Sequence, residues 1–198
     1  MKKITYMLLA GALLCSCADE KPHFLPAPGG TVEIGGIGAT PSSDAAALLD
    51  DDLTTYFEAE VGSENSVEAV VDCSAGRIVA YTLVSSGVVE QGDNGVEALY
   101  DPVSWKVYGS DDGASWNEVD SRSEVAFIAR FQKHIYYLAA PADYAKYKFV
   151  FKANGGDKLT LSDILFHTED PYAAWKNFES PEILFIDLAE DKGSKLYD

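Results

Sequence analysis

The sequence predicts an all-β protein, built as an antiparallel β-sandwich with a few short helical turns. From Thr31 onward the apolar segments are short, rich in β-branched and aromatic residues, and separated by Gly, Asn, Asp and Pro. In segments 105–108 and 147–151 apolar residues alternate with polar ones, as in a sheet that packs one face on a core. No repeat with a period of about 20 to 50 residues is visible, which argues against a solenoid or a propeller.

Each expected strand is an apolar run that ends at turn-forming residues. In chain order the expected strands are 67–72, 78–84, 103–108, 125–131, 135–139, 147–151 and 159–166. Two short segments look helical instead, 44–49 with Ser43 as its cap and 171–178. Trp105 and Trp116 flank the turn-rich segment 109–113, and we expect both rings to fill the sandwich.

The N-terminus reads as an export signal. Lys2 and Lys3 precede an apolar run through Leu14 that is too short to span a bilayer permanently. The ending Leu-Cys-Ser-Cys resembles a bacterial lipobox with Cys17 as the acylated residue, and a plain secretory signal is the alternative. We therefore expect residues 1–16 to be a lipoprotein signal peptide, 17–34 a tether, 35–168 the sandwich, and 169–198 a C-terminal extension of unknown role.

The charge balance favours some partners and excludes others. The chain has 15 basic and 32 acidic side chains and a net charge of −17, which excludes nucleic acid as the main partner. Acidic residues directly after Cys17 resemble the surface-export signals of lipoproteins in Bacteroidetes-type envelopes, although a solvated tether would look the same. The sequence thus predicts a lipid-anchored protein of the outer membrane, facing the cell surface. Cys73, the only internal cysteine, is expected to be a buried small hydrophobe.

Three segments together resemble one known family. Residues 48–57 read Leu-Leu-Asp-Asp-Asp-Leu-Thr-Thr-Tyr-Phe, and residues 101–116 run from Asp-Pro-Val-Ser-Trp into Gly-Ser-Asp-Asp-Gly-Ala-Ser-Trp. With Leu-Ser-Asp-Ile at 161–164, they resemble discoidin domains, the coagulation-factor type C domains. The resemblance implies a galactose-binding-like jelly roll, which in bacteria serves mainly as a carbohydrate-binding module, as in family 32. A fold does not determine its ligand, because other relatives bind membranes or proteins.

Three successive carboxylates, Asp50, Asp51 and Asp52, point to a cation. They would lie at the C-terminal end of the first short helix, where backbone carbonyls already concentrate negative charge, and oxygen-rich loops suit Ca²⁺. The resemblance implies a structural calcium, and Asp51 stands where the family has Gly, while Asp163 stands where it has Glu. The alternative is an acidic turn solvated by water. By position, the expected ligands are Ala47, Asp50, Asp52, Thr55 and Asp163.

A sugar site needs an aromatic face and a few polar groups aimed at hydroxyls. Many galactose-binding relatives have a His after the first motif and an Arg at the end of a later strand. This sequence has Glu58 and Glu60 at the first place and Ser85-Ser86 at the second, so a galactose-type site is in doubt. The expected contacts, any of which could instead be solvated loop, are Glu58, Glu60, Asn65, Gln91, Asp93, Asn94 and Tyr100.

Enzymatic function is not predicted. The sequence has no His-Glu-x-x-His, no Gly-x-Ser-x-Gly and no phosphate-binding glycine loop, and its three histidines are scattered. We therefore expect a non-catalytic lipoprotein that captures glycans or polysaccharide through loops at one end of the sandwich. The alternative is an interaction or assembly lipoprotein that uses the same sandwich to bind a protein partner in the envelope.

Overall fold

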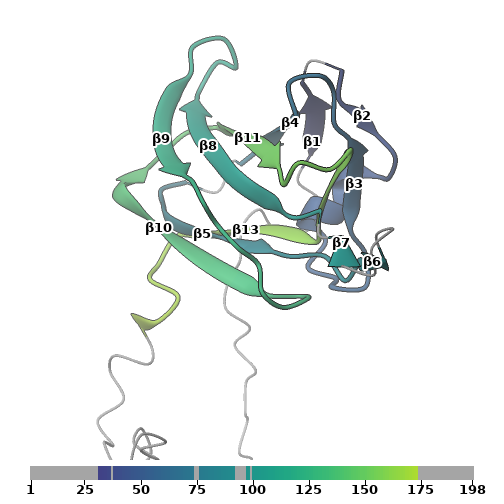
Figure 1. Ribbon diagram of the computed structural model, residues 1–198. Helices are drawn as coiled ribbons and strands as arrows, with labels where there is room; N and C mark the ends of the chain where they lie inside the picture. The colour runs from purple at the N-terminus through teal and green to yellow at the C-terminus, as the bar shows by residue number, and fades with distance from the viewer. Residues whose placement is uncertain (1–30, 37, 74–75, 92–96, 99, 174–198) are drawn as a thin grey trace, which may run out of the picture.

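The structure, a computed structural model, describes residues 31–36, 38–73, 76–91, 97–98 and 100–173, with only the backbone of residues 90, 91, 97 and 98. It confirms an all-β antiparallel fold (Figure 1). The five-stranded sheet has the order β1 (Val32–Gly35), β4 (Ser66–Asp72), β11 (Lys146–Ala153), β8 (Pro102–Ser110), β9 (Asn117–Arg122). Facing it is a three-stranded sheet with the order β10 (Lys133–Ala142), β5 (Ile78–Val84), β13 (Asp163–His167).

Smaller elements close one side of the sandwich. A second three-stranded sheet has the order β12 (Lys158–Leu161), β3 (Phe57–Glu60), β2 (Thr40–Pro41). The short strands β6 (Glu90–Gln91) and β7 (Glu97–Ala98) pair with each other, and a 3₁₀ helix η1 covers Ala45–Leu49. Within the described ranges, no helix is both long and apolar enough to cross a membrane.

Alternation along the strands places the core between the two facing sheets. On β11 every second side chain is buried, and Tyr147, Phe149 and Phe151 point inward. Trp105 of β8 lies beside them, and Phe166 of β13 contacts Phe149 with ring centroids 6.0 Å apart. Burying one such side chain contributes about 1.5 to 3 kcal/mol, so this aromatic layer dominates the packing energy.

The polar ends of two core aromatics are satisfied by one chain of hydrogen bonds. Trp105 Nε1 donates to the hydroxyl of Tyr81 at 2.7 Å, and that hydroxyl donates to Asp120 Oδ2 at 2.6 Å. Arg122 Nε donates to the same carboxylate oxygen at 2.8 Å. Burial, then the bond to Asp120, raises the pKa of Tyr81 far above its usual value, so the phenol stays protonated. Trp105 is thus a structural residue, as expected. The expectation that Trp116 also fills the sandwich is wrong, because its ring is only partly buried and lies 4.7 Å from Nζ of Lys148, whose side chain is not among the buried ones of β11.

Five expected strands are confirmed, as β4, β5, β8, β10 and β11. The strand expected at 125–131 is wrong, because this segment runs as a loop from β9 to β10 with Phe131 in the left-handed region, φ 56°. The strand expected at 159–166 is broken at Ser162 into β12 and β13, which belong to different sheets.

Two boundaries also differ from expectation. Residues 32–34 lie inside the segment expected to be a tether, yet together with Gly35 they form β1 and pair with β4. The first helical turn is capped by Asp44, whose Oδ1 accepts from Ala46 N at 2.9 Å. Ser43 Oγ instead lies 2.7 Å from Glu58 N and ties the turn to β3. The helix expected at 171–178 extends past residue 173 and so lies partly outside the described residues.

Candidate functional site

One end of the sandwich forms around the C-terminal end of β5. Val84, the last residue of β5, pairs with Lys133 on one side and with Asp163 on the other. The next residues join this end to the smaller sheet, because Ser86 Oγ and Thr160 Oγ1 lie 2.7 Å apart and Thr160 N donates to Tyr100 O at 2.8 Å. The loop from β5 to β8 and the loop from β9 to β10 therefore meet at this end (Figure 1).

Two of the expected sugar contacts are brought together. Glu58 lies on the outward face of β3, where Oε1 accepts from Ser42 Oγ at 2.9 Å. Its Oε2 is 3.9 Å from Lys158 Nζ, and the same Nζ stands 5.6 Å from the ring centroid of Tyr100. Lys158, which sequence reasoning missed, thus places a cation between the predicted carboxylate and the predicted aromatic ring.

The remaining expected contacts do not form one group with these. Glu60 is exposed at the end of β3, opposite Lys158 in the strand register. Asn65 stabilises a turn: its φ is 53° and its Nδ2 donates to Ala153 O at 3.0 Å. Gln91 is described only through its backbone, which pairs with Glu97. Asp93 and Asn94 lie outside the described residues.

A guanidinium from another segment reaches the backbone of Ser86, one of the two residues at the sequence position where many relatives have an arginine. Arg130, from the loop between β9 and β10, donates through one terminal nitrogen to the carbonyl of Ser86 at 3.2 Å. The two terminal nitrogens also bind the two carboxylate oxygens of Asp101, at 3.2 and 2.5 Å. Burial raises the pKa of Asp101, and Arg130 opposes that shift. Arg130 and Asp101 lie 29 residues apart in the sequence, and no local motif predicts that they pair.

The loop that carries Arg130 is held by side-chain hydrogen bonds at several points. Ser85 Oγ donates to Ala129 O at 3.0 Å and accepts from Gln132 N at 2.8 Å. Gln132 Oε1 accepts from the backbone nitrogens of Ile128 and Ala129, at 2.8 and 3.2 Å. These bonds replace a strand ladder, and they hold the neighbouring Phe131 in its left-handed conformation.

This loop presents apolar side chains to solvent. Ile128 is 87% exposed and Phe131 is 46% exposed. The Cζ end of the Phe131 ring approaches the backbone of Gly87 so closely that a Cβ there would lie 2.3 Å from it. Phe131 was not among the expected contacts, because the strand predicted for 125–131 gave no reason for its ring to stay at the surface.

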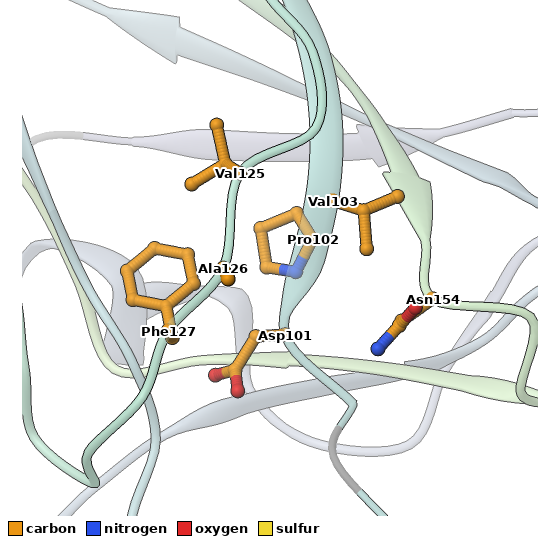
Figure 2. Close-up of a pocket in the computed structure, with 7 residues that line it drawn as sticks. All are labelled: Asp101, Pro102, Val103, Val125, Ala126, Phe127 and Asn154. Atoms are coloured by element: carbon orange, nitrogen blue, oxygen red, sulfur yellow. The ribbon is translucent and has the colours of Figure 1, made fainter.

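A pocket of about 170 Å³ lies beside the ion pair (Figure 2). Pro102 and Val103 at the start of β8 form one part of its wall, and Val125 and Phe127 of the β9–β10 loop form another. Asp101 and Asn154 supply polar atoms, and in Figure 2 Phe127 and Asn154 stand on opposite sides of Pro102. The pocket is therefore mostly apolar with polar groups at its margin.

Hydrogen bonds bring several of the expected calcium ligands together in the acidic loop after η1. Asp50 is the C-terminal cap of η1, its Oδ1 accepts from Asp52 N at 3.0 Å, and Thr55 Oγ1 lies 2.7 Å from its Oδ2. The Thr55 hydroxyl also lies 2.9 Å from Asp52 O. Asp51 has a φ of 53°, a conformation that Gly adopts easily and Asp tolerates, which explains why Gly stands there in the family. Ala47 lies within η1.

Asp163 approaches this loop from β13. It is fully buried, its Oδ1 accepts from Asp51 N at 3.1 Å, and its Oδ2 has no hydrogen-bond partner in the described part of the chain. Burial first, and then the negative charges of Asp50 and Asp51, raise the pKa of Asp163 to about 6. A buried oxygen without a partner beside an acidic loop fits a cation. Even so, no three His, Cys, Asp or Glu side chains among the described residues form a metal-binding group, so hydroxyl and carbonyl oxygens would have to complete the shell.

No protein-family model matches the sequence, and no curated protein matches it significantly. Solved structures do match. The paired modules CBM32-1 and CBM32-2 of Clostridium perfringens ZmpB, in complex with GalNAc, superpose with a TM-score of 0.54 and 22% identity over 71% of this chain and 34% of that one. The protein has the fold of family 32 carbohydrate-binding modules.

Two further family 32 structures from the same organism agree. The module of C. perfringens NanJ in complex with galactose has a TM-score of 0.51 and 8% identity, over 69% of this chain and 92% of that one. CpGH89CBM32-5, in complex with GalNAc-β-1,3-galactose, has a TM-score of 0.50 and 10% identity, over 69% and 94%. At these identities the likeness is one of fold, and the ligand must be argued from this chain's own residues.

Proposed function

We propose that this protein is a non-catalytic glycan-binding module with the family 32 fold, held at the cell envelope by a lipid on Cys17. Its binding end is the loop end around Ser86. The observation that carries the proposal is a solvent-exposed aromatic ring, Phe131, which lies against Gly87, next to the Ser86 carbonyl that accepts from Arg130.

The chemistry of this end suits a sugar. A sugar ring offers apolar C–H groups on its faces and hydroxyls at its edge, so its sites combine an aromatic surface with polar groups. Phe131 provides the surface, and its strained backbone persists because Ser85 and Gln132 fix the loop around it. Because the protein's own hydrogen bonds hold the loop, a ligand would have to repay less of the entropy of ordering it.

The second half of the proposed site is the group made by Tyr100, Lys158 and Glu58. It offers a half-buried ring, an ammonium and a carboxylate within a few ångströms of one another. Ser86 and Thr160, joined by a buried hydrogen bond, connect this group to the side that carries Arg130. The proposed ligand is therefore a neutral sugar, because the chain's net charge of −17 disfavours anionic glycans.

The proposal is tested with the chain from residue 18 onward, which lacks the acylated cysteine. Glycan-array screening followed by isothermal titration calorimetry should detect a neutral glycan as ligand. Phe131→Ala should weaken that binding by about tenfold, the equivalent of losing about 1.4 kcal/mol of ring contact. Tyr172→Ala, which removes another exposed ring (48% exposed), is the matched control and should bind like the wild type.

Calcium is the second part of the proposal. Ca²⁺ would be held by Asp50, Asp52, Thr55 and Asp163, with the Ala47 carbonyl, and would fasten the loop after η1 to β13. The support is the Oδ2 of Asp163, which has no hydrogen-bond partner among the residues that the structure describes, together with the raised pKa of this carboxyl group. Millimolar calcium should then raise the melting temperature relative to EDTA, and a melting temperature indifferent to both would reject the site.

The anchor is the third part. Replacing Cys17 with Ser should release the protein from the membrane fraction, since acyl chains on this residue would supply the binding energy. Protease treatment of intact cells then tests on which face of the outer membrane the protein lies. A protein on the cell surface is digested, whereas one that faces the periplasm is protected until the cells are lysed.

A protein partner is the alternative function, and one observation favours it. Ile128 is 87% exposed beside Phe131, and a bare aliphatic side chain has little use in contact with sugar hydroxyls. If Ile128→Asp leaves glycan binding intact but abolishes co-purification of an envelope protein, the loop serves a protein partner as well. If glycan arrays are negative and that partner is still lost, protein binding replaces glycan binding as the function.

A further inference from the structure

The segment 85–87 is joined to the β9–β10 loop by contacts at three successive residues. The backbone nitrogen of Ser85 donates to Gln132 O at 3.0 Å, and the Ser85 hydroxyl makes two further hydrogen bonds with the same loop. The carbonyl of Ser86 accepts from Arg130 at 3.2 Å. The third contact is made by residue 87, a glycine that meets an aromatic ring of the loop. The hydrogen bonds on either side of this contact hold the glycine and the ring together.

The outer end of the Phe131 ring lies against Gly87. A Cβ on Gly87 would be 2.3 Å from Cζ, 2.8 Å from Cε1 and 3.2 Å from Cε2 of the ring. Carbon atoms that are not bonded to each other pack at about 3.5 to 4.0 Å, so no side chain fits at residue 87 while the ring keeps its place. Phe131 is 46% exposed, and with its outer end covered it presents other parts of its surface to solvent.

The ring, and not the backbone, is what requires glycine at this position. Gly87 is not among the described glycines with positive φ, so its φ would not strain an alanine. It is also exposed, and an alanine there would be open to solvent on its other sides. The atoms in its way are the far end of a surface side chain, which can swing outward. Alanine at residue 87 should therefore turn the ring away without unfolding the loop.

We infer that Gly87 is a positioning residue for glycan binding. Its missing side chain lets the Phe131 ring rest on the backbone, so that the ring is oriented before a sugar arrives. A ring that is already held does not have to be immobilised by the ligand, and immobilising one side chain weakens binding by about twofold to tenfold. The inference rests on the proposed glycan-binding function and names the residue that orients its aromatic surface.

Calorimetry with the chain from residue 18 onward tests the inference, with the neutral disaccharides lactose, maltose and cellobiose as probes. Gly87→Ala should bind the preferred disaccharide about threefold to tenfold more weakly than wild type. Its melting temperature should stay within about 3 °C of wild type, because only an exposed ring has to move. Equal affinities of Gly87→Ala and wild type overturn the inference and leave the glycan-binding function standing. Absence of binding to all three disaccharides by the wild type overturns both.

Gly109→Ala is the matched control, because it creates the same kind of clash away from the loops that meet at Ser86. Gly109 lies near the C-terminal end of β8, and a Cβ there would be 2.0 Å from the ring of Tyr144. This variant should lose stability, and below its melting temperature it should bind the disaccharide like wild type. Binding that is weakened equally in Gly109→Ala and Gly87→Ala would show a general effect of the clash and overturn the inference.

A double variant tests whether Gly87 acts through the ring. Once Phe131→Ala has removed the ring, Gly87→Ala should change the affinity by less than about twofold, since residues that act through one contact are not additive. A merely structural effect of Gly87→Ala would weaken binding by the same factor in both backgrounds. That additive result would overturn the positioning role.

Nuclear magnetic resonance of the free protein gives a readout that needs no sugar. The ring-tip proton of Phe131 should show nuclear Overhauser contacts to the α protons of Gly87, and the ring signals should move in Gly87→Ala. The same ring signals should stay in place in Gly109→Ala. Absence of these contacts in wild type overturns the inference, whatever the calorimetry gives.

Discussion

We expect an unusual response to substitution at Asp163, because its buried carboxylate has fewer hydrogen-bond donors than a buried charge requires. One carboxylate oxygen has a single backbone donor, the Asp51 amide, and the other has no partner among the described residues. In the absence of a cation, replacing Asp163 with Asn should therefore stabilise the protein. Asn keeps the acceptor for Asp51 N and places a neutral donor group toward the acidic loop.

The magnitude follows from the pKa. Burial raises the pKa of Asp163 to about 6 in the folded protein, against about 3.9 in an unfolded chain. The folded state then binds the proton more tightly, so the free energy of unfolding falls as pH rises from about 4 to about 6. A shift of about two pH units corresponds to about 3 kcal/mol lost above pH 7. Asp163→Asn should recover about 2 to 3 kcal/mol there, or about 4 to 12 °C in melting temperature.

Thermal unfolding followed by circular dichroism measures this directly. In EDTA at pH 7.5 the variant should melt above wild type, and the difference should vanish near pH 4. With millimolar calcium the order should reverse, because only the wild type keeps the charged ligand. A variant that melts below wild type in EDTA at pH 7.5 would refute the reasoning.

Other predictions concern the packing that supports the site, and each is measured by thermal or urea unfolding. Gly109→Ala should lower the free energy of unfolding by about 1 to 3 kcal/mol, because a Cβ there would lie 2.0 Å from the ring of Tyr144. The control Gly35→Ala, whose Cβ would be 4.0 Å from its nearest neighbour, should lower it by less than about 1 kcal/mol. Equal losses of stability in the two variants would contradict the predicted clash. Arg130→Met leaves the buried Asp101 unpaired and should cost about 3 to 5 kcal/mol, most of which the double variant with Asp101→Asn should recover. A double variant as unstable as the single one would show that the charge is not the cause.

The strands that could be predicted are those in which one face is buried. In β11 Tyr147, Phe149 and Phe151 alternate with lysine and valine, and this alternation predicts one buried and one outward face. β9 escaped prediction because it is an edge strand whose only aliphatic residue is Val119, so its sequence carries no alternation.

The segment 125–131 shows the opposite failure. Its apolar residues satisfy a strand pattern, and Phe127 is indeed buried, but Ile128 is the most exposed large apolar side chain described. The side chain of Gln132 favours the loop over a strand. Its Oε1 accepts hydrogen bonds from the backbone N–H groups of Ile128 and Ala129, which a neighbouring strand would otherwise accept. No periodicity in the sequence records that choice.

The candidate site was predictable where a motif is local and not where it is assembled from distant segments. The acidic loop could be read from three consecutive aspartates, and the structure brings Asp163 to it. Arg130 meets Ser86 across 44 residues of sequence, and Lys158 meets Tyr100 and Glu58 from a separate strand. Such pairings depend on how the sheets close, which residue types alone do not specify.

The central claim is that the end around Ser86 binds a neutral glycan. Isothermal titration calorimetry of the chain from residue 18 onward, with the glycan selected on an array, tests it most directly. The account predicts saturable binding that Phe131→Ala weakens by about tenfold and Tyr172→Ala leaves unchanged. Binding that is equally strong in Phe131→Ala, or no glycan bound by a correctly folded wild type, would contradict it.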